Sequence, residues 1–301
     1  MQSVYAMTQS HSEDLLKEEK FLKQSIRKMF DLYVLSLQLM VEVQKLSKDK
    51  LEISKNKFLA TSEDLQPNTK FVDNKFINKL AESTSLQIHI EAYKLDDWEL
   101  NDEYVKLIHE KLIKSDLFRR YLASDDDSSK EDKEFVLNFY KEIIASDVKL
   151  ADYYEDANIS WSDDLAFVNT WVVRTLSQLS TSRDFVLGKL YKNQDDQDFV
   201  SDLFRKVMLH HHQYEENIRS NTPNWESDRI ADLDMIIIKM GICEFLEFSS
   251  VPVRVTINEY IELAKDYSTS KSGYFVNGVL DRLSREYLDN KRIVKVGRGL
   301  L

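Results

Sequence analysis

Three groups of side chains in this 301-residue sequence are of the types used by metal or nucleophilic chemistry: His210-His211-His212, the single cysteine Cys243, and Asp125-Asp126-Asp127. Consecutive residues of a helix point about 100° apart. Three adjacent histidines therefore cannot converge on one metal ion, which needs pairs at i and i+4. Cys243 has no neighbouring cysteine or histidine and lies in an apolar segment. We interpret it as a buried, inert thiol.

The acidic run is most simply a solvated loop together with Ser128 and Ser129. A divalent-ion site there is the alternative that we disfavour. Gly297-x-Gly299 follows no βα unit, so it is not a phosphate loop. Strands and a glycine-rich turn of a nucleotide-binding α/β domain are also missing from the sequence. We therefore predict a protein that is not an enzyme and uses no metal or cofactor.

The composition indicates that helices are the elements that position these side chains. The chain has only six glycines and three prolines, no segment alternates as a strand does, and hairpin dipeptides are absent. We predict an all-α fold. The longest helical pattern covers residues 12–57, where the apolar run Tyr33–Val43 predicts burial on several sides and the charged end Lys45–Lys57 predicts exposure. A core helix is favoured over a coiled-coil dimer.

Further helices are predicted between Thr61 and Gln194. Their patterns lie near Asn74–Tyr93, Asp102–Tyr121 and Glu134–Tyr154, and a fourth helix follows Ser162-Asp163-Asp164, with Ser162 as its N-cap. One more helix is predicted over Phe199–Ser220, and Asn221-Thr222-Pro223 predicts a break after it.

Three closely spaced amphipathic helices are predicted between Trp225 and Leu283. The stripe of the first consists of Ile230, Leu233, Ile237 and Met240. Thr256 and Glu259 have the spacing of a capping box at the start of the second helix. Gly278 interrupts the third, at a cost of about 1 kcal/mol relative to alanine. This cost predicts that a neighbouring helix backbone approaches closely at Gly278.

The same stretch resembles a known family. The strings Ile257-Asn258-Glu259-x-Ile261-Glu262-Leu263-Ala264-Lys265 and Phe275-Val276-Asn277-Gly278-Val279-Leu280-Asp281 are similar to the C-terminal half of the NusB family of bacterial antitermination factors. Arg229-Ile230, Leu233-Asp234 and Glu244-Phe245-Leu246 fall where that family has the preceding helix. Near the N-terminus, Met1–Ala6 resembles the Q-x-L-Y segment of the family's first helix.

This resemblance implies two NusB-like helical sub-bundles with a domain-sized helical insertion. In the N-terminal half, 1–222, the NusB-like parts would be about 1–10 and 198–220, and the insertion would occupy about 11–197. Residues 223–301 would form the C-terminal half, which ends in a basic tail.

The resemblance also implies an RNA-binding factor for transcription antitermination and ribosomal RNA synthesis. Such a factor binds boxA-type single-stranded RNA together with NusE, a small ribosomal subunit protein, in complexes with RNA polymerase. The positions that match the family's RNA side are Tyr5, Lys271, Ser272, Tyr274 and Phe275. Among these, Tyr5 and Phe275 keep the residue type expected.

Charge leaves a second function open. The net charge of −11 opposes non-specific binding to nucleic acid. An arginine-rich stretch precedes the Q-x-L-Y segment in the family, whereas this sequence begins at Met1. We favour an upstream start of the reading frame over loss of the RNA surface. The alternative function is a protein-interaction scaffold. One cysteine, no signal peptide and no apolar membrane span predict a cytoplasmic protein, and the resemblance implies a bacterial one.

Overall fold

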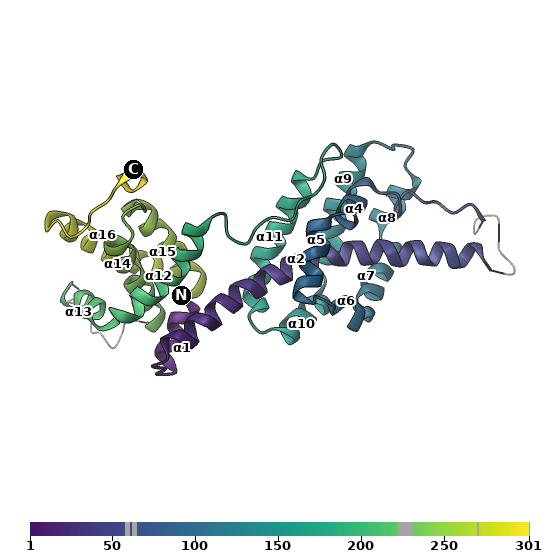
Figure 1. The fold of residues 1–301 in the computed structure, drawn as a ribbon. Coiled ribbons are helices and arrows are strands. Elements are labelled where there is room, and N and C mark those ends of the chain that lie inside the picture. The colour runs from purple at the N-terminus through teal and green to yellow at the C-terminus, as the bar shows by residue number, and fades with distance from the viewer. Residues whose placement is uncertain (58–60, 62–64, 222–230, 270, 301) are drawn as a thin grey trace. The chain divides into compact units, whose positions relative to one another are not determined.

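The computed structural model describes residues 1–57, 61, 65–221, 231–269 and 271–300, and all regular elements within these ranges are helices. This confirms the predicted all-α fold. The chain divides into two compact units (Figure 1). Unit 1 consists of Met1–Gln24 and Tyr191–Leu301, and unit 2 consists of Ser25–Leu190. Unit 2 lies wholly inside the segment where the sequence predicts an insertion.

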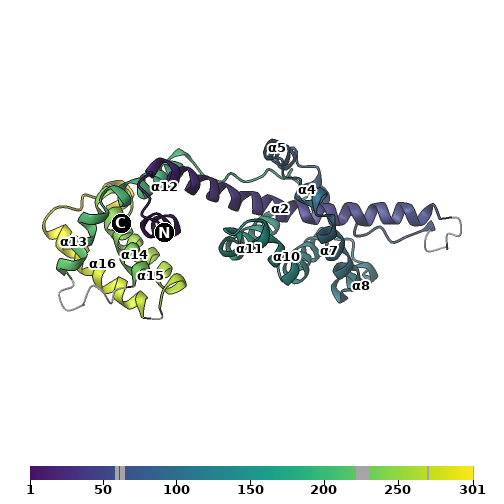
Figure 2. The ribbon, with the colours of Figure 1, turned by 90° about the horizontal axis from the view of Figure 1, so that it is seen from below.

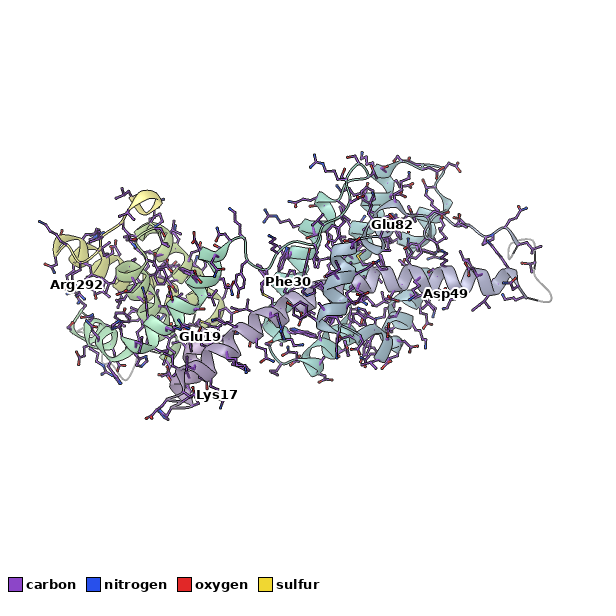
Figure 3. The ribbon with its side chains drawn as sticks, viewed as in Figure 1. Lys17, Glu19, Phe30, Asp49, Glu82 and Arg292 are labelled. Carbon is purple, nitrogen blue, oxygen red and sulfur yellow. The ribbon has the colours of Figure 1, made fainter. Side chains whose placement is uncertain are left out.

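Helix α2 (Leu15–Lys55) is one continuous helix of 41 residues, and the boundary between the units falls inside it. In unit 2, nearly all of its side chains from Phe30 to Val43 are buried, as the sequence predicts. Figure 2 shows the reason: α5 lies on one side of α2, whereas α10 and α11 lie on the other. The last turns of α2, around Asp49, extend beyond these helices and are largely exposed (Figure 3).

Shorter helices surround α2 in unit 2. They are α4 (Lys75–Ala81), α5 (Thr84–Tyr93), α6 (Asp97–Leu100), α7 (Asp102–Lys114), α8 (Asp116–Ala123), α9 (Ser129–Asn138), the π-helix η1 (Phe139–Ile144), α10 (Val148–Ala157) and α11 (Trp161–Gln178). Two tryptophans of these helices donate hydrogen bonds to α2. Trp98 Nε1 lies 3.0 Å from the Leu35 carbonyl oxygen, and Trp161 Nε1 lies 2.8 Å from that of Lys28.

Several helices predicted as single are divided. Asn74–Tyr93 contains α4 and α5, and Asp102–Tyr121 contains α7 and most of α8. The cause is local, because the hydroxyl oxygens of Ser83 and Ser115 accept hydrogen bonds from the first turn of a new helix. Glu134–Tyr154 is likewise divided among three elements. The predicted cap at Ser162 is wrong, since α11 begins at Trp161 after Ser160.

Unit 1 is a bundle around α14 (Asp232–Glu247), whose residues from Asp234 to Phe245 are all buried. The other elements of the bundle are α1 (Gln2–Gln9), α12 (Gln194–Leu209), α13 (His211–Asn221), α15 (Val253–Tyr267), α16 (Ser272–Asp289) and the 3₁₀ turn η3 (Gly297–Leu300). One hydrophobic cluster joins α1, α12, α13, α14, α15 and α16. Pro223, where a break was predicted, and Ile230 of the predicted stripe lie outside the described residues.

Two further predictions for unit 1 are wrong. The helix predicted over Phe199–Ser220 is divided at His210, because the chain turns there so that Val207 and Tyr214 both enter the core. Thr256 caps no helix end. Helix α15 already begins after Pro252, so Thr256 lies within its first turns and its hydroxyl bonds elsewhere.

Gly278 also differs from expectation. No heavy atom lies within 4 Å of the position that a Cβ would take there, and the residue is exposed. The close helix contact is instead at Gly241 of α14, where a Cβ would lie 2.8 Å from Leu280 Cδ2. Gly278 therefore accommodates no neighbouring backbone.

Candidate functional site

The first turn of α14 fixes two other helices of unit 1. Gln9 Nε2, at the end of α1, donates a hydrogen bond of 2.9 Å to Asp232 Oδ2. The Ser272 hydroxyl, at the start of α16, donates one of 2.8 Å to Asp234 Oδ2. Acidic residues in the first turn also complement the partial positive charge of the helix N-terminus. The two segments that the sequence singles out therefore attach to the same end of α14.

Ser272 is the centre of a buried polar cluster. Its side chain and that of Asp234 are almost completely buried, with exposed fractions of 2% and 6%. The hydroxyl groups of Ser268 and Thr269 lie 2.9 and 2.8 Å from the Ser272 hydroxyl oxygen, and the Thr269 backbone N–H also points to it. Ser272 therefore fixes the turn between α15 and α16 from the inside.

The other predicted site residues differ in exposure. Tyr274 is 85% exposed, and Tyr5 is 37% exposed on the turn of α1 that precedes Gln9. Lys271 is exposed at the N-cap of α16, while Phe275 packs partly against the core of unit 1. The rings of Tyr5 and Tyr274 and the ammonium group of Lys271 are therefore accessible at this end of the bundle. Ser272 and Phe275 anchor the start of α16, where Lys271 and Tyr274 lie.

Lys265 is a further cation beside Tyr274 that the sequence analysis missed. Its side chain lies along the start of α16, with Cγ 3.3 Å from where a Cβ of Gly273 would be. Its ammonium group forms an ion pair of 2.6 Å with Glu262. This hydrogen bond raises the pKa of Lys265. The only signal for Lys265 in the sequence is its place at the end of the family-like string Ile257–Lys265, which does not show that the side chain reaches the start of α16.

A second buried carboxylate of α14 holds α15. The Thr256 hydroxyl donates a hydrogen bond of 2.6 Å to Glu244 Oε1, and the Tyr260 hydroxyl donates one of 3.0 Å to Oε2. Burial raises the pKa of Glu244, and these hydrogen bonds oppose that shift. Lys295 Nζ donates to the Glu244 carbonyl in the last turn of α14 and to the carbonyl of Phe248, the C-cap of that helix. Glu244 thus sets the position of α15.

The histidine run does not form a metal site in the described residues. His211 Nε2 lies 2.9 Å from the buried Lys239 Nζ, which also donates a 2.7 Å hydrogen bond to Glu215 Oε2. No group of three or more His, Cys, Asp or Glu side chains in the described ranges is placed to hold a metal ion. His211 therefore belongs to the contact between α13 and α14.

The acidic loop in unit 2 encloses an ammonium group of the chain itself. Lys70 Nζ donates to the carbonyl oxygens of Ser124 and Asp126, at 2.9 and 2.8 Å, and to Glu131 Oε2 at 2.7 Å. A cation of the protein thus occupies the place where we considered a divalent ion. Cys243 is buried as predicted, and burial raises the pKa of its thiol to about 12, which keeps it protonated.

Comparisons with known proteins match the C-terminal part of the chain. The model of the NusB family matches residues 170–285. The transcription antitermination protein NusB of Salinibacter ruber is 40% identical over 112 residues, which are 37% of this chain and 70% of that protein. The proteins of the same name from Methylacidiphilum infernorum and Chloroherpeton thalassium are 40% and 38% identical over 94 and 104 residues.

These last two alignments cover 66% and 49% of the relatives and 31% and 35% of this chain, so the chain spans between half and about two thirds of their length. No solved structure matches the chain. Within the described ranges, every helix is too short or too polar to cross a lipid bilayer. The match at α11–α16, together with the coverage of the Salinibacter protein, establishes that the chain belongs to the NusB family.

Proposed function

We propose that this chain is a transcription antitermination factor that binds single-stranded, boxA-like RNA together with a NusE-type small ribosomal subunit protein. It would act in a complex with RNA polymerase during ribosomal RNA synthesis, in the bacterial cytoplasm. The observation that carries the proposal is the shared attachment of α1 and α16 to the first turn of α14 in a NusB-family bundle. Enzymatic activity forms no part of it.

The chemistry of the exposed groups supports RNA as the ligand. Proteins bind single-stranded RNA by stacking bases on aromatic rings and by placing cations near phosphates. Tyr5 and Tyr274 offer rings, and Lys271 and Lys265 offer ammonium groups. Each stacked base contributes about 1–3 kcal/mol. Two rings and two cations suit a short RNA segment and not a long duplex.

Weak binding is expected from these residues alone. For a single strand, log K for binding falls linearly with log[salt], and each phosphate that the protein neutralises contributes about −0.7 to the slope. With Lys271 and Lys265 as the nearby cations, we expect a slope of about −1.4, and the net charge of −11 opposes binding further. An arginine-rich segment attached before Met1 should raise the affinity and steepen the slope by about 0.7 for each new phosphate contact.

Fluorescence anisotropy of a labelled boxA RNA, with and without the NusE-type protein and over a series of salt concentrations, tests the proposal. Tyr274→Ala should weaken binding about 5- to 150-fold, as expected for one lost stacking contact of about 1–3 kcal/mol. Lys271→Gln should reduce the salt slope by about 0.7. Lys291→Gln is the matched control, because it removes the same charge beyond the opposite end of α16.

Equal effects of the two lysine substitutions would contradict a site at the start of α16. No detectable RNA binding with the partner protein present, even after attachment of the arginine-rich segment, would contradict the function as a whole. That second outcome would leave the protein-interaction scaffold as the function to pursue, with the ribosomal protein as the first partner to assay.

A further inference from the structure

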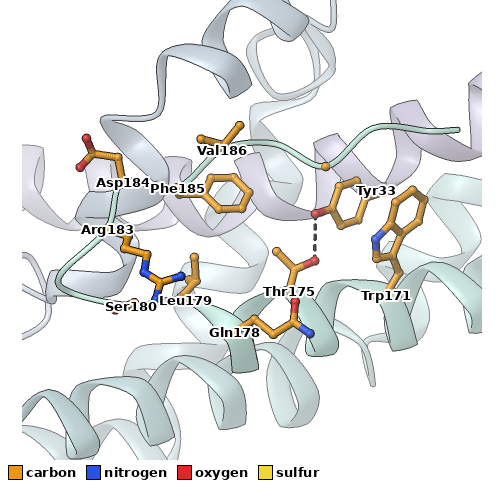
Figure 4. Close-up of a pocket in the computed structure, with 11 residues that line it drawn as sticks. Tyr33, Trp171, Thr175, Gln178, Leu179, Ser180, Arg183, Asp184, Phe185 and Val186 are labelled. Carbon is orange, nitrogen blue, oxygen red and sulfur yellow. Dashed lines mark hydrogen bonds between the residues drawn. The ribbon is translucent and has the colours of Figure 1, made fainter. Parts of the chain in front are cut away.

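Unit 2 contains a cavity to which the proposed function assigns no role. It has a volume of about 560 Å³ and lies between α11, Tyr33 of α2 and the extended segment 180–190, here called the strap (Figure 4). Sites for small molecules commonly have volumes of about 300–1,000 Å³. The cavity is therefore large enough for a metabolite-sized ligand.

The strap is held in place by its own contacts, which gives the cavity a preformed wall. The Ser83 hydroxyl donates a hydrogen bond of 2.9 Å to the Phe185 carbonyl oxygen, and the Leu187 N–H donates one of 2.7 Å to the Ser85 hydroxyl oxygen. Asp184 forms an ion pair of 2.8 Å with Lys79. Because these contacts already order the strap, a ligand would not bear the entropic cost of doing so.

Aromatic rings form the apolar part of the cavity. Trp171 stacks on Tyr33 with ring centroids 4.3 Å apart and an angle of 13° between the planes. The Tyr33 hydroxyl is 2.9 Å from the Thr175 hydroxyl, which fixes the ring. Phe185 of the strap lies on the other side of Tyr33 from Trp171 in Figure 4. A flat, aromatic ligand suits these walls better than an aliphatic one.

The polar groups of the cavity suit an anion attached to such a ring. Arg183 and Gln178 are exposed there and make no hydrogen bond or ion pair with the described residues. A guanidinium group binds phosphate through two parallel N–H donors. The Gln178 amide offers both a donor and an acceptor, as the edge of a nucleobase requires. Asp184, the one acidic residue of the lining, is already paired with Lys79.

We infer that this cavity is a nucleotide site, in which the base lies against Phe185 and the edge of the stacked Tyr33 and Trp171 rings, and the phosphate pairs with Arg183. Unit 2 has 30 acidic and 23 basic residues, so it repels a long polyanion. A nucleoside monophosphate carries only about two negative charges, far fewer than a long RNA, so it is the ligand that fits both the cavity and the acidic unit. The same base-plus-phosphate chemistry occurs at the 5′ end of an RNA strand.

Isothermal titration calorimetry of the full chain with AMP, GMP, CMP and UMP tests this inference. At least one should bind with a Kd of about 1 mM or tighter, and the corresponding nucleoside and inorganic phosphate should each bind at least about tenfold more weakly. Arg183→Gln should weaken binding about tenfold or more, as expected for one charge-assisted contact. Gln178→Ala should change the preference among the four bases.

Arg174→Gln is the matched control, because Arg174 is an exposed arginine on α11 that does not line the cavity. A 5′-phosphorylated tetraribonucleotide distinguishes the two sources of the ligand. If only this oligonucleotide binds and Arg183→Gln abolishes its binding, the ligand is an RNA end. If neither the monophosphates nor the oligonucleotide respond to Arg183→Gln more than to Arg174→Gln, the inference is wrong.

Discussion

Ser272→Ala should loosen the end of the bundle that carries the proposed RNA surface. The Ser272 hydroxyl is the donor to the carboxylate of Asp234, whose Oδ1 has no hydrogen-bond partner. A buried acceptor that loses its donor costs about 1–3 kcal/mol. The substitution also removes the partner of the Thr269 N–H and of the Ser268 and Thr269 hydroxyl groups, so four contacts of the Ser272 hydroxyl are lost at once.

Hydrogen exchange measured by mass spectrometry reports the local free energy of opening, so it can detect this change without global unfolding. Peptides that cover the end of α15 and the first turn of α16 should exchange about 5- to 150-fold faster in Ser272→Ala, the factor that corresponds to about 1–3 kcal/mol. Peptides from unit 2 should exchange at an unchanged rate. RNA binding should weaken in parallel, because Lys271 and Tyr274 then lose their fixed positions.

Ser284→Ala is a matched control on the same helix. Ser284 is also buried, but its hydroxyl donates to a backbone carbonyl of its own helix, that of Asp281, and to no carboxylate. Its removal should change exchange by less than about threefold, because alanine favours the helix and offsets the lost bond. Equal protection of the α15–α16 turn in the two variants would refute the role assigned to Ser272, whatever the result with RNA.

Two other predictions concern stability. Gly278→Ala should stabilise the protein by about 0.5–1 kcal/mol, since the added Cβ meets open space and alanine favours the helix; thermal unfolding followed by circular dichroism measures this, and a lowered midpoint would contradict the exposed position. The hydrogen bond from Lys239 lowers the pKa of Glu215 to about 2, so Glu215 stabilises the fold above its unfolded pKa of about 4.3 and loses that contribution as the pH falls towards 2. Lys239→Met should therefore flatten the dependence of the unfolding midpoint on pH between about 4 and 2, and parallel curves for the two proteins would rule this out.

The periodicity of apolar residues was sufficient to predict the structure where a long apolar pattern determines the packing. The single helix α2 and the burial of Tyr33–Val43 follow from side-chain spacing alone, because a helix that is apolar on all sides must be surrounded. Helix ends were less predictable. Ser83 and Ser115 begin new helices within patterns that look continuous, and a serine within a helix and a serine at its N-cap are indistinguishable until the chain turns.

The roles of single residues were the hardest to predict when the same residue type can serve two different structural purposes. Gly241 and Gly278 both lie in apolar helices, but only the first faces another helix closely. The sequence contains no information on which of the two meets Leu280, since that depends on how α14 and α16 are rotated against each other. Thr256 has the spacing of a cap, but its hydroxyl is used by Glu244, a residue twelve positions earlier. Long-range partners of this kind are invisible to local patterns.

The carboxylates of α14 explain how the proposed RNA surface is held by unit 1 alone. Asp232 holds the end of α1, Asp234 holds the start of α16 and Glu244 holds α15. All of these contacts join residues of unit 1, and none uses a side chain from Ser25–Leu190. The chain leaves unit 1 after Gln24 and returns at Tyr191, outside every one of them. The segment between these points has its own core and lines its own cavity, and it contributes nothing to these contacts, which position the helices that carry Tyr5, Lys271 and Tyr274.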